Sequence, residues 1–199
     1  MRMTHRTLTF YGLQVPDRHA VRAVFDADTI TVYQAYSPAI ALPALDAQRF
    51  VPPFKRDRMT WVKPSFLWMM YRSGWATKEG QERVLAVRLR RDGFDAAVAE
   101  ACLSHYVPGI HESRAAWSRA LRTSPVRVQW DPERDLHLRP LEHRSLQLGL
   151  SGAAVHRYVD EWTVGIRDVT PLVHEIHALV EARALEEAAA LLPPERPYQ

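Results

Sequence analysis

The chain has 199 residues, enough for one domain with a substantial core, and its 47% apolar and 25% charged residues are typical of a soluble globular protein. No apolar run approaches the roughly 20 residues that a membrane-spanning helix needs, and the N-terminal residues lack the apolar segment of a signal peptide. A net charge of +3 permits contact with phosphates without requiring it. The single cysteine, Cys102, cannot form an intrachain disulfide, so we expect a cytoplasmic protein. Because no apolar run is long enough to span a bilayer, we expect no membrane partner. Nothing in the composition predicts an oligomeric state.

The first elements are read from apolar spacing and cap residues. Residues 17–27 carry apolar side chains at helical spacing and predict a helix that begins at Asp17. Residues 29–36, rich in β-branched and aromatic side chains, predict a strand. Ser37 followed by Pro38 predicts that the next helix begins there.

The middle of the chain contains a loop, two strands and a short helix. Residues 49–58, with two prolines and mixed charge, predict a loop, and residues 59–63 predict a short strand. Residues 64–73 predict a helix that ends at Gly74. Residues 82–90 alternate in hydrophobicity and predict a strand with one buried face.

The second half completes an α+β pattern. Helices are predicted at residues 92–106, 110–124, 151–161 and 170–192, and strands at residues 126–130, 144–150 and 162–170. Asp131 and Pro132 predict a turn after the strand at 126–130. Cys102 is expected at a buried helical position. The proline-rich residues 193–199 are expected to fray. We therefore expect one domain with its core at about residues 18–192, built on a mixed or antiparallel central sheet of five to six strands flanked by helices.

Several standard motifs are missing from the sequence. It contains no GxGxxG or GxxxxGK[ST] phosphate loop, no GxSxG elbow and no cysteine pairs for zinc. His174 and His177 in VHEIH are spaced differently from the HExxH pair of zinc proteases, so we expect no metal cofactor.

The strand at residues 29–36 contains the first candidate site residues. Alternation along a strand puts Tyr33 on one face and both Gln34 and Tyr36 on the other. A buried amide costs free energy unless it is hydrogen-bonded. Gln34 therefore either holds a carboxamide or ribose hydroxyls of a ligand or bonds a neighbouring strand or loop.

The segment TWVKPSFLWMMYRSGW contains a second group of candidates. Trp61 and Lys63 share one strand face, and Ser65 lies at the start of the following helix, where exposed N–H groups favour anions. Trp68 and Arg72 lie on one side of that helix. The segment predicts a modest phosphate site, and the alternative is that the aromatic side chains pack in the core with Arg72 at their rim.

The later strands supply acidic, basic and amide candidates. The segment VQWDPERD places four of them at a strand end and turn: Trp130, Asp131, Glu133 and Arg134. Such positions are often catalytic because a rigid strand positions a loop, although Asp-Pro is also an ordinary turn. Arg144 and Gln147 belong to the strand at 144–150, and Glu161 precedes the strand at 162–170.

Six segments resemble the bacterial and fungal family known as domain of unknown function 4291. The resemblance covers about residues 18–185. The segments are TVYQAYSPAIA, RFVPPF, RMTWVKPSFLWMMYRSGWATK continued after one residue by GQERVLA, VQWDPERD, RSLQLGL and EWTVGIRDVT. The order of strands and helices is also similar to the ADP-ribosyltransferase fold, whose members split NAD and transfer ADP-ribose to protein or nucleic acid.

The second resemblance implies roles for particular residues. It implies catalytic roles for Gln34, Glu133, Gln147 and Glu161, NAD binding by Tyr33, Tyr36, Trp61, Lys63, Ser65, Trp68 and Arg72, and acceptor binding by Trp130, Asp131, Arg134 and Arg144. We therefore expect an ADP-ribosyltransferase that uses NAD as its substrate and acts on nucleic acid or protein. The alternatives are a non-catalytic module that binds RNA or single-stranded DNA, and a metal-dependent nuclease-like enzyme that uses Asp131 and Glu133.

Overall fold

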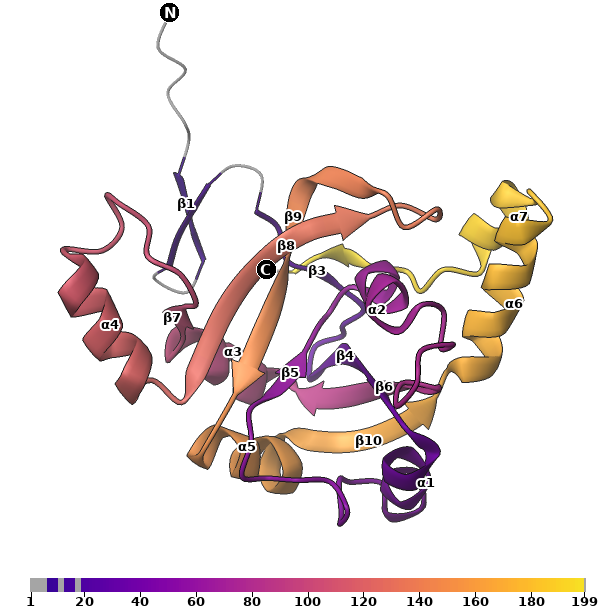
Figure 1. The fold of residues 1–199 in the computed structure, drawn as a ribbon, viewed down its shortest axis with the longest axis horizontal. Coiled ribbons are helices and arrows are strands. Elements are labelled where there is room, and N and C mark those ends of the chain that lie inside the picture. Colours follow the sequence, from indigo (N-terminus) through magenta and orange to yellow (C-terminus); the bar gives the residue numbers. More distant parts are fainter. Residues whose placement is uncertain (1–6, 11–12, 17–18, 199) are drawn as a thin grey trace, which may run out of the picture.

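The computed structural model of the protein describes residues 7–10, 13–16 and 19–198. They form a single α+β domain with two larger sheets and two short two-stranded ribbons (Figure 1). The strands are β1 (Thr7–Phe10), β2 (Leu13–Pro16), β3 (Arg22–Ala23), β4 (Thr29–Tyr36), β5 (Thr60–Val62), β6 (Arg83–Arg90), β7 (Cys102–Leu103), β8 (Val126–Arg134), β9 (Pro140–Leu150), β10 (Thr163–Asp168) and β11 (Arg196–Pro197). The helices are α1 (Pro38–Ala47), α2 (Phe66–Ser73), α3 (Arg91–Ala99), α4 (Arg114–Thr123), α5 (Ala153–Arg157), a π-helical turn (Tyr158–Trp162), α6 (Thr170–Glu181) and α7 (Leu185–Ala190).

Seven of the described strands divide between two sheets rather than forming the single central sheet that the sequence predicted. One sheet has the order β10-β6-β4 and is antiparallel, and the other has the order β5-β9-β8-β7. They meet at one bridge between Tyr33 and Lys63, where the Tyr33 N–H donates to the Lys63 carbonyl at 2.7 Å. Pro64 follows immediately and has no N–H to extend the pairing.

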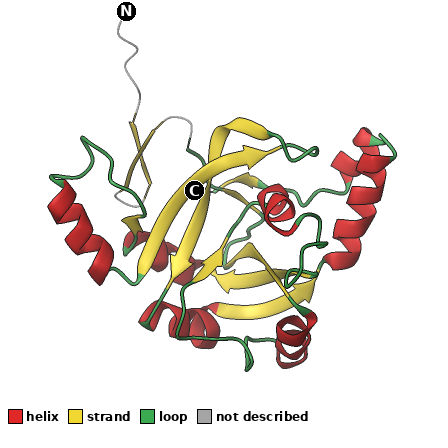
Figure 2. Cartoon of the chain, in the orientation of Figure 1, coloured by secondary structure: helices red, strands yellow, loops and turns green. Residues whose placement is uncertain are grey.

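The main core lies between the two sheets. Alternate residues of β4 and β6, including Val32 and Val87, face alternate residues of β8 and β9, including Val128 and Leu148, and all four are buried. A smaller core packs the other face of β4 and β6 against α2 and α6. Figure 2 shows most of the helices around the outside of the strands. No described helix combines the length and the apolar character that crossing a membrane requires.

The local predictions hold best between residues 29 and 90. The strand β4, the start of α1 at Pro38, the loop after it, β5, α2 and β6 all lie where the sequence placed them. Gly74 ends α2 in the left-handed conformation, with φ of 59°, which glycine adopts without steric cost. The predicted alternation of β4 is also confirmed, since Tyr33 belongs to the smaller core and Tyr36 to the main core.

The predicted helix at 17–27 and the predicted frayed tail are both wrong where the structure describes them. β3 and β11 pair antiparallel, with Arg196 opposite Ala23, although they lie at opposite ends of the chain. Tyr198 is buried and its ring packs edge-on against Phe25 and Phe94. Burial of this ring holds the tail in place. The proposed cap Asp17 lies outside the described residues.

Two boundaries in the second half also differ from the prediction, the end of α3 and the end of β8. α3 ends at Ala99, and Cys102 is half-buried on β7 because the chain turns there to pair parallel with β8. Asp131 and Pro132 lie inside β8, and the turn falls after it, where the Asp135 carboxylate accepts from the His137 and Arg139 N–H groups.

The strand predicted at 162–170 and the helix predicted at 170–192 are each shorter. A π-helical turn ends at Trp162, and a bulge at the start of β10 leaves Val164 44% exposed instead of facing the core. Arg183 takes a positive φ of 61°, which separates α6 from α7. Such breaks depend on tertiary packing and leave no strong local pattern.

Candidate functional site

A cavity of about 370 Å³ opens beside the point where the two sheets meet. Its walls come from β4, β5, β9 and α2, and from the segment that follows α2. Six of the residues predicted from the sequence line it: Gln34, Tyr36, Trp61, Trp68, Arg72 and Gln147. The structure therefore gathers most of the proposed NAD-binding side chains around one hollow.

Gln34 and Tyr36 form the inner wall of this cavity. The Gln34 amide donates to Thr60 Oγ1 at 2.8 Å and to the Trp61 carbonyl at 2.9 Å, and its carbonyl oxygen accepts from the Tyr158 hydroxyl at 2.6 Å. The Tyr36 hydroxyl lies 3.2 Å from Thr60 Oγ1, and burial raises the pKa of Tyr36 to about 12. These contacts account for the burial of Gln34 as a link between β4, β5 and the π-helical turn.

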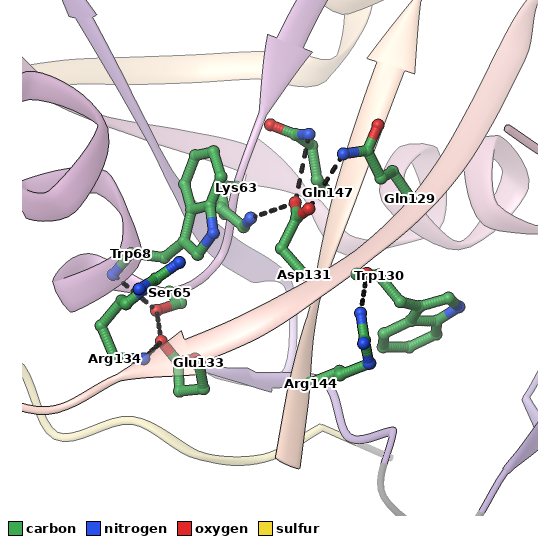
Figure 3. A network of polar contacts seen from close by, with 10 residues as sticks. All are labelled: Lys63, Ser65, Trp68, Gln129, Trp130, Asp131, Glu133, Arg134, Arg144 and Gln147. Carbon is green, nitrogen blue, oxygen red and sulfur yellow. Dashed lines mark hydrogen bonds and ion pairs between the residues drawn. The ribbon is translucent and has the colours of Figure 1, made fainter. Parts of the chain in front are cut away.

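Lys63 lies beneath the outer wall and is almost fully buried, with its side chain 1% exposed. Its Nζ is 2.8 Å from Asp131 Oδ2 and 2.9 Å from the centre of the Trp68 ring (Figure 3). Burial lowers the pKa of Lys63 to about 7, and the attraction of Asp131 only partly opposes that shift. The ion pair therefore changes from net neutral to net negative near neutral pH.

Asp131 accepts hydrogen bonds from two glutamines, one on its own strand β8 and one on the adjacent strand β9. Gln129 on β8 stands opposite Gln147 on β9, and their amides donate to the Asp131 carboxylate at 2.9 and 3.3 Å. Figure 3 shows these side chains converging on the same carboxylate as Lys63. Asp131 keeps 17% of its side chain exposed, and Gln147 connects it to the cavity wall. Asp131 is thus an oriented carboxylate that solvent can still reach.

Ser65 and Glu133 form a separate buried group at the start of α2. The Ser65 hydroxyl donates to Glu133 Oε1 at 2.7 Å and accepts from the Trp68 N–H at 3.1 Å. The same Glu133 oxygen accepts from the Arg134 N–H at 2.9 Å. Ser65 therefore caps the helix, and Glu133 holds the cap in place.

The hydrogen-bond acceptor at this helix start is a carboxyl group of the chain itself. The Phe66 N–H donates to Glu195 Oε1 at 2.7 Å. Burial raises the pKa of Glu195 to about 8. The affinity of this helix start for an anion was predictable from the sequence, but a partner 129 residues away was not.

The residues predicted to bind the acceptor lie outside the cavity wall. The Arg134 guanidinium stacks on Tyr71, 3.6 Å from the ring centre, and Arg144 donates to the Trp130 carbonyl at 3.0 Å. Trp130 is buried in the main core. Their contacts are those of structural residues.

Two further candidates are also separated from the cavity. Tyr33 faces the opposite side of β4, and burial raises its pKa far above the usual value. Glu161 is exposed on the π-helical turn.

Sequence reasoning missed three residues of this site. Arg58 and Glu79 line the cavity from loops before β5 and after α2. Gly149 lies beneath Trp61, because a Cβ at that position would come within 2.8 Å of the indole ring. A glycine inside a strand often marks such a close approach, and that was the available signal.

Together the fold and the site define a class: a small α+β domain whose two sheets meet at an aromatic and polar cavity, with a buried lysine–aspartate pair behind its wall. The chain belongs to the family described as Domain of unknown function (DUF4291), whose model matches residues 20–198. The search of curated proteins found no match.

Proposed function

We propose that this protein is an ADP-ribosyltransferase that binds NAD in the cavity beside α2 and transfers its ADP-ribose to a nucleic acid or protein. The observation that carries the proposal is the combination around one cavity of aromatic rings, two arginines and an oriented carboxylate. Trp61, Trp68, Arg58 and Arg72 line it, and Asp131 is bonded to the lining residue Gln147. Each group matches one part of a dinucleotide.

Binding is divided between rings and cations. An aromatic face such as that of Trp61 can stack the nicotinamide, and arginine side chains bind phosphate oxygens through charge-assisted hydrogen bonds. The cavity of about 370 Å³ is near the lower end of ligand sites, which span roughly 300–1,000 Å³. It therefore suits the nicotinamide–ribose half, with the pyrophosphate at Arg58 and Arg72 near the mouth.

The chemistry requires a negative charge beside the ribose. The bond between ribose C1′ and the nicotinamide nitrogen breaks, its electron pair stays with the departing nicotinamide, and positive charge develops on the ribose. The Asp131 carboxylate, which lies behind the wall and is bonded to the lining residue Gln147, stabilises that charge through space, and the acceptor then attacks C1′ and releases its proton to water. Since the pKa of Lys63 is about 7, the Lys63–Asp131 pair gains net negative charge as pH rises through neutrality.

The test measures NAD binding by calorimetry and nicotinamide release with RNA, single-stranded DNA and protein acceptors. Arg72→Gln removes an exposed cation, and we expect about tenfold weaker NAD binding. Asp131→Asn should lower release at least about a hundredfold while NAD still binds.

Two surface variants provide matched controls, Asp46→Asn on α1 and Arg119→Gln on α4, both exposed and outside the cavity lining. Thermal unfolding checks that each variant is folded. Absence of NAD binding, or release that is unchanged in a folded Asp131→Asn protein, would refute the proposal.

The outward face of the second sheet favours one other candidate, a module that binds single-stranded nucleic acid. Arg127, Gly149 and Trp61 stand side by side in register across β8, β9 and β5. Such a face can stack a base and hold a phosphate. Affinity for single strands that falls steeply with salt and disappears in Trp61→Ala, without NAD turnover, would favour this candidate.

The nuclease-like alternative has less support. Asp131 and Glu133 belong to separate hydrogen-bonded groups, one with Lys63 and the other with Ser65. Within the part of the chain that the structure describes, no group of three or more His, Cys, Asp or Glu side chains is placed to hold a metal ion.

A further inference from the structure

A second and larger cavity, of about 630 Å³, lies on the opposite side of β4. Its floor is the outward face of the β10-β6-β4 sheet, and its other walls come from α6 and from the end of α7 with the prolines that follow. The strand register fixes the floor. Thr31, Arg88 and Gly165 stand in one row across the three strands, and Tyr33, Ala86 and Arg167 stand in the next.

The two arginines of this floor are close neighbours of like charge. Arg88 lies opposite Gly165, so Arg167 is its diagonal neighbour, and such neighbours are typically about 7–8 Å apart, with their Cβ atoms somewhat closer. Neither guanidinium has a hydrogen-bond or ion-pair partner among the residues that the structure describes. The carboxylate of Asp26 is within electrostatic range of Arg88, but its oxygens accept from Thr29 and Asp28. Like charges repel at this spacing, and an anion between them would remove that repulsion.

Most of the remaining lining is apolar, although Thr31, Tyr33 and Gln48 also contribute polar groups, and the floor is shallow. Ala86 and Gly165 carry almost no side chain between the arginines, which leaves room above the sheet. Val164, exposed by 44%, and Leu172, Leu191 and Leu192 supply apolar walls. The cavity thus offers two cations at one place and hydrocarbon around it.

We propose that this cavity binds a small organic anion with an apolar body, of the class of medium-chain carboxylates. The carboxylate lies between Arg88 and Arg167, where a guanidinium can donate two hydrogen bonds. The hydrocarbon chain packs against Val164, Leu172 of α6 and the two leucines that follow α7, where its burial adds affinity in proportion to its apolar area. This site is separate from the NAD cavity, because Tyr33 faces one and Gln34 the other.

The test is calorimetric titration of the full chain with decanoate, with decanol and acetate as probes that lack the charge or the chain. We expect decanoate to bind at one site and to bind much more tightly than either probe. Arg88→Gln and Arg167→Gln should each weaken decanoate binding about tenfold or more, and Arg119→Gln on the remote α4 should leave it unchanged.

Gly165→Leu provides an independent variant that fills the cavity. A Cβ at Gly165 would meet only Gln48 Oε1, at an ordinary distance of 3.7 Å, so the substitution does not force the backbone. We expect it to abolish decanoate binding, and the arginine variants test the site even if this variant folds poorly. The proposal fails if decanoate does not bind, if decanol binds as well as decanoate, or if the two floor arginines behave like Arg119.

Discussion

Replacing Glu195 with glutamine should remove a pH dependence from the stability of the folded protein. Burial raises the pKa of this carboxyl to about 8, although the Phe66 N–H and Arg22 act in the opposite direction. Glutamine keeps an oxygen that can accept from Phe66 but has no proton to lose. The difference between the two proteins therefore isolates the titration of one group.

The sign follows from which state holds the proton. Between the ordinary pKa of 4.5 and the folded value of about 8, the folded protein stays protonated while the unfolded chain has released its proton, so stability falls as pH rises. One proton corresponds to about 1.4 kcal/mol per pH unit, which sets an upper bound of about 3 kcal/mol between pH 5 and pH 7. Partial solvent contact of the side chain screens the effect, so we expect about 1–2 kcal/mol.

Other shifted groups act mainly outside this interval. Burial lowers the pKa of Lys63 to about 7. Between pH 7 and the ordinary value of 10.5 the folded protein has released this proton while the unfolded chain still holds it, so this group makes stability rise with pH. The lowered pKa values of Asp26 and Glu100, which follow from hydrogen bonds to backbone N–H groups and to Arg157, affect stability only in acid. The interval from pH 5 to pH 7 is therefore the cleanest one for Glu195.

The assay is urea unfolding at pH 5, 6 and 7, followed by tryptophan fluorescence. The unfolding free energy of the unmodified protein should decline across the series relative to Glu195→Gln, because only the unmodified protein has the Glu195 carboxyl to titrate. Glu186→Gln, on the exposed side of α7, should behave like the unmodified protein. Parallel pH profiles for Glu195→Gln and the unmodified protein would refute the buried protonated carboxyl.

Two further substitutions test the packing around the candidate site and the main core. At pH 5–6, below the folded pKa of Lys63 of about 7, Lys63→Met should destabilise by about 3 kcal/mol because it leaves the Asp131 carboxylate without its cation. Adding Asp131→Asn should recover part of that loss, and strictly additive effects in chemical unfolding would contradict the pairing. Gly93→Ala should lower the unfolding free energy by about 1–3 kcal/mol because a Cβ there would lie 2.3 Å from the Trp162 indole. Gly165→Ala is the control, because a Cβ at that position meets no such clash. Equal melting temperatures for the two variants would count against the overlap.

The parts of the fold that the sequence predicted are those specified locally. Alternation fixed the faces of β4, and the serine and glycine at the ends of α2 marked its limits. β3 and β11 were missed because two residues at each end of the chain carry no pattern of their own and pair only across the whole sequence. The division into two sheets was missed for a related reason, since local alternation says nothing about which strands are neighbours.

The candidate site shows the same limit. Residue type identified Lys63 and Asp131 as candidates separately, but their ion pair joins positions 68 apart. The sequence also placed Gln34 correctly on a buried face while leaving its role open. Only the structure shows that Tyr158, 124 positions away, completes its hydrogen bonds. Burial of a polar side chain is readable from alternation, whereas the partner that satisfies it is not.

At the start of α2, the sequence predicts a phosphate site that the contacts in the structure do not leave open. Exposed N–H groups, a hydroxyl and a cation in KPSF are the features of a phosphate site, and the structure contains all of them. A side chain of the protein already bonds each of these groups: Glu195 accepts from the helix N–H, Glu133 accepts from Ser65, and Asp131 pairs with Lys63. A ligand phosphate at this place would have to displace Glu195. In the proposed NAD complex we therefore assign the pyrophosphate to Arg58 and Arg72, which line the cavity, and we expect Lys63 to hold Asp131 in position rather than to touch the nucleotide.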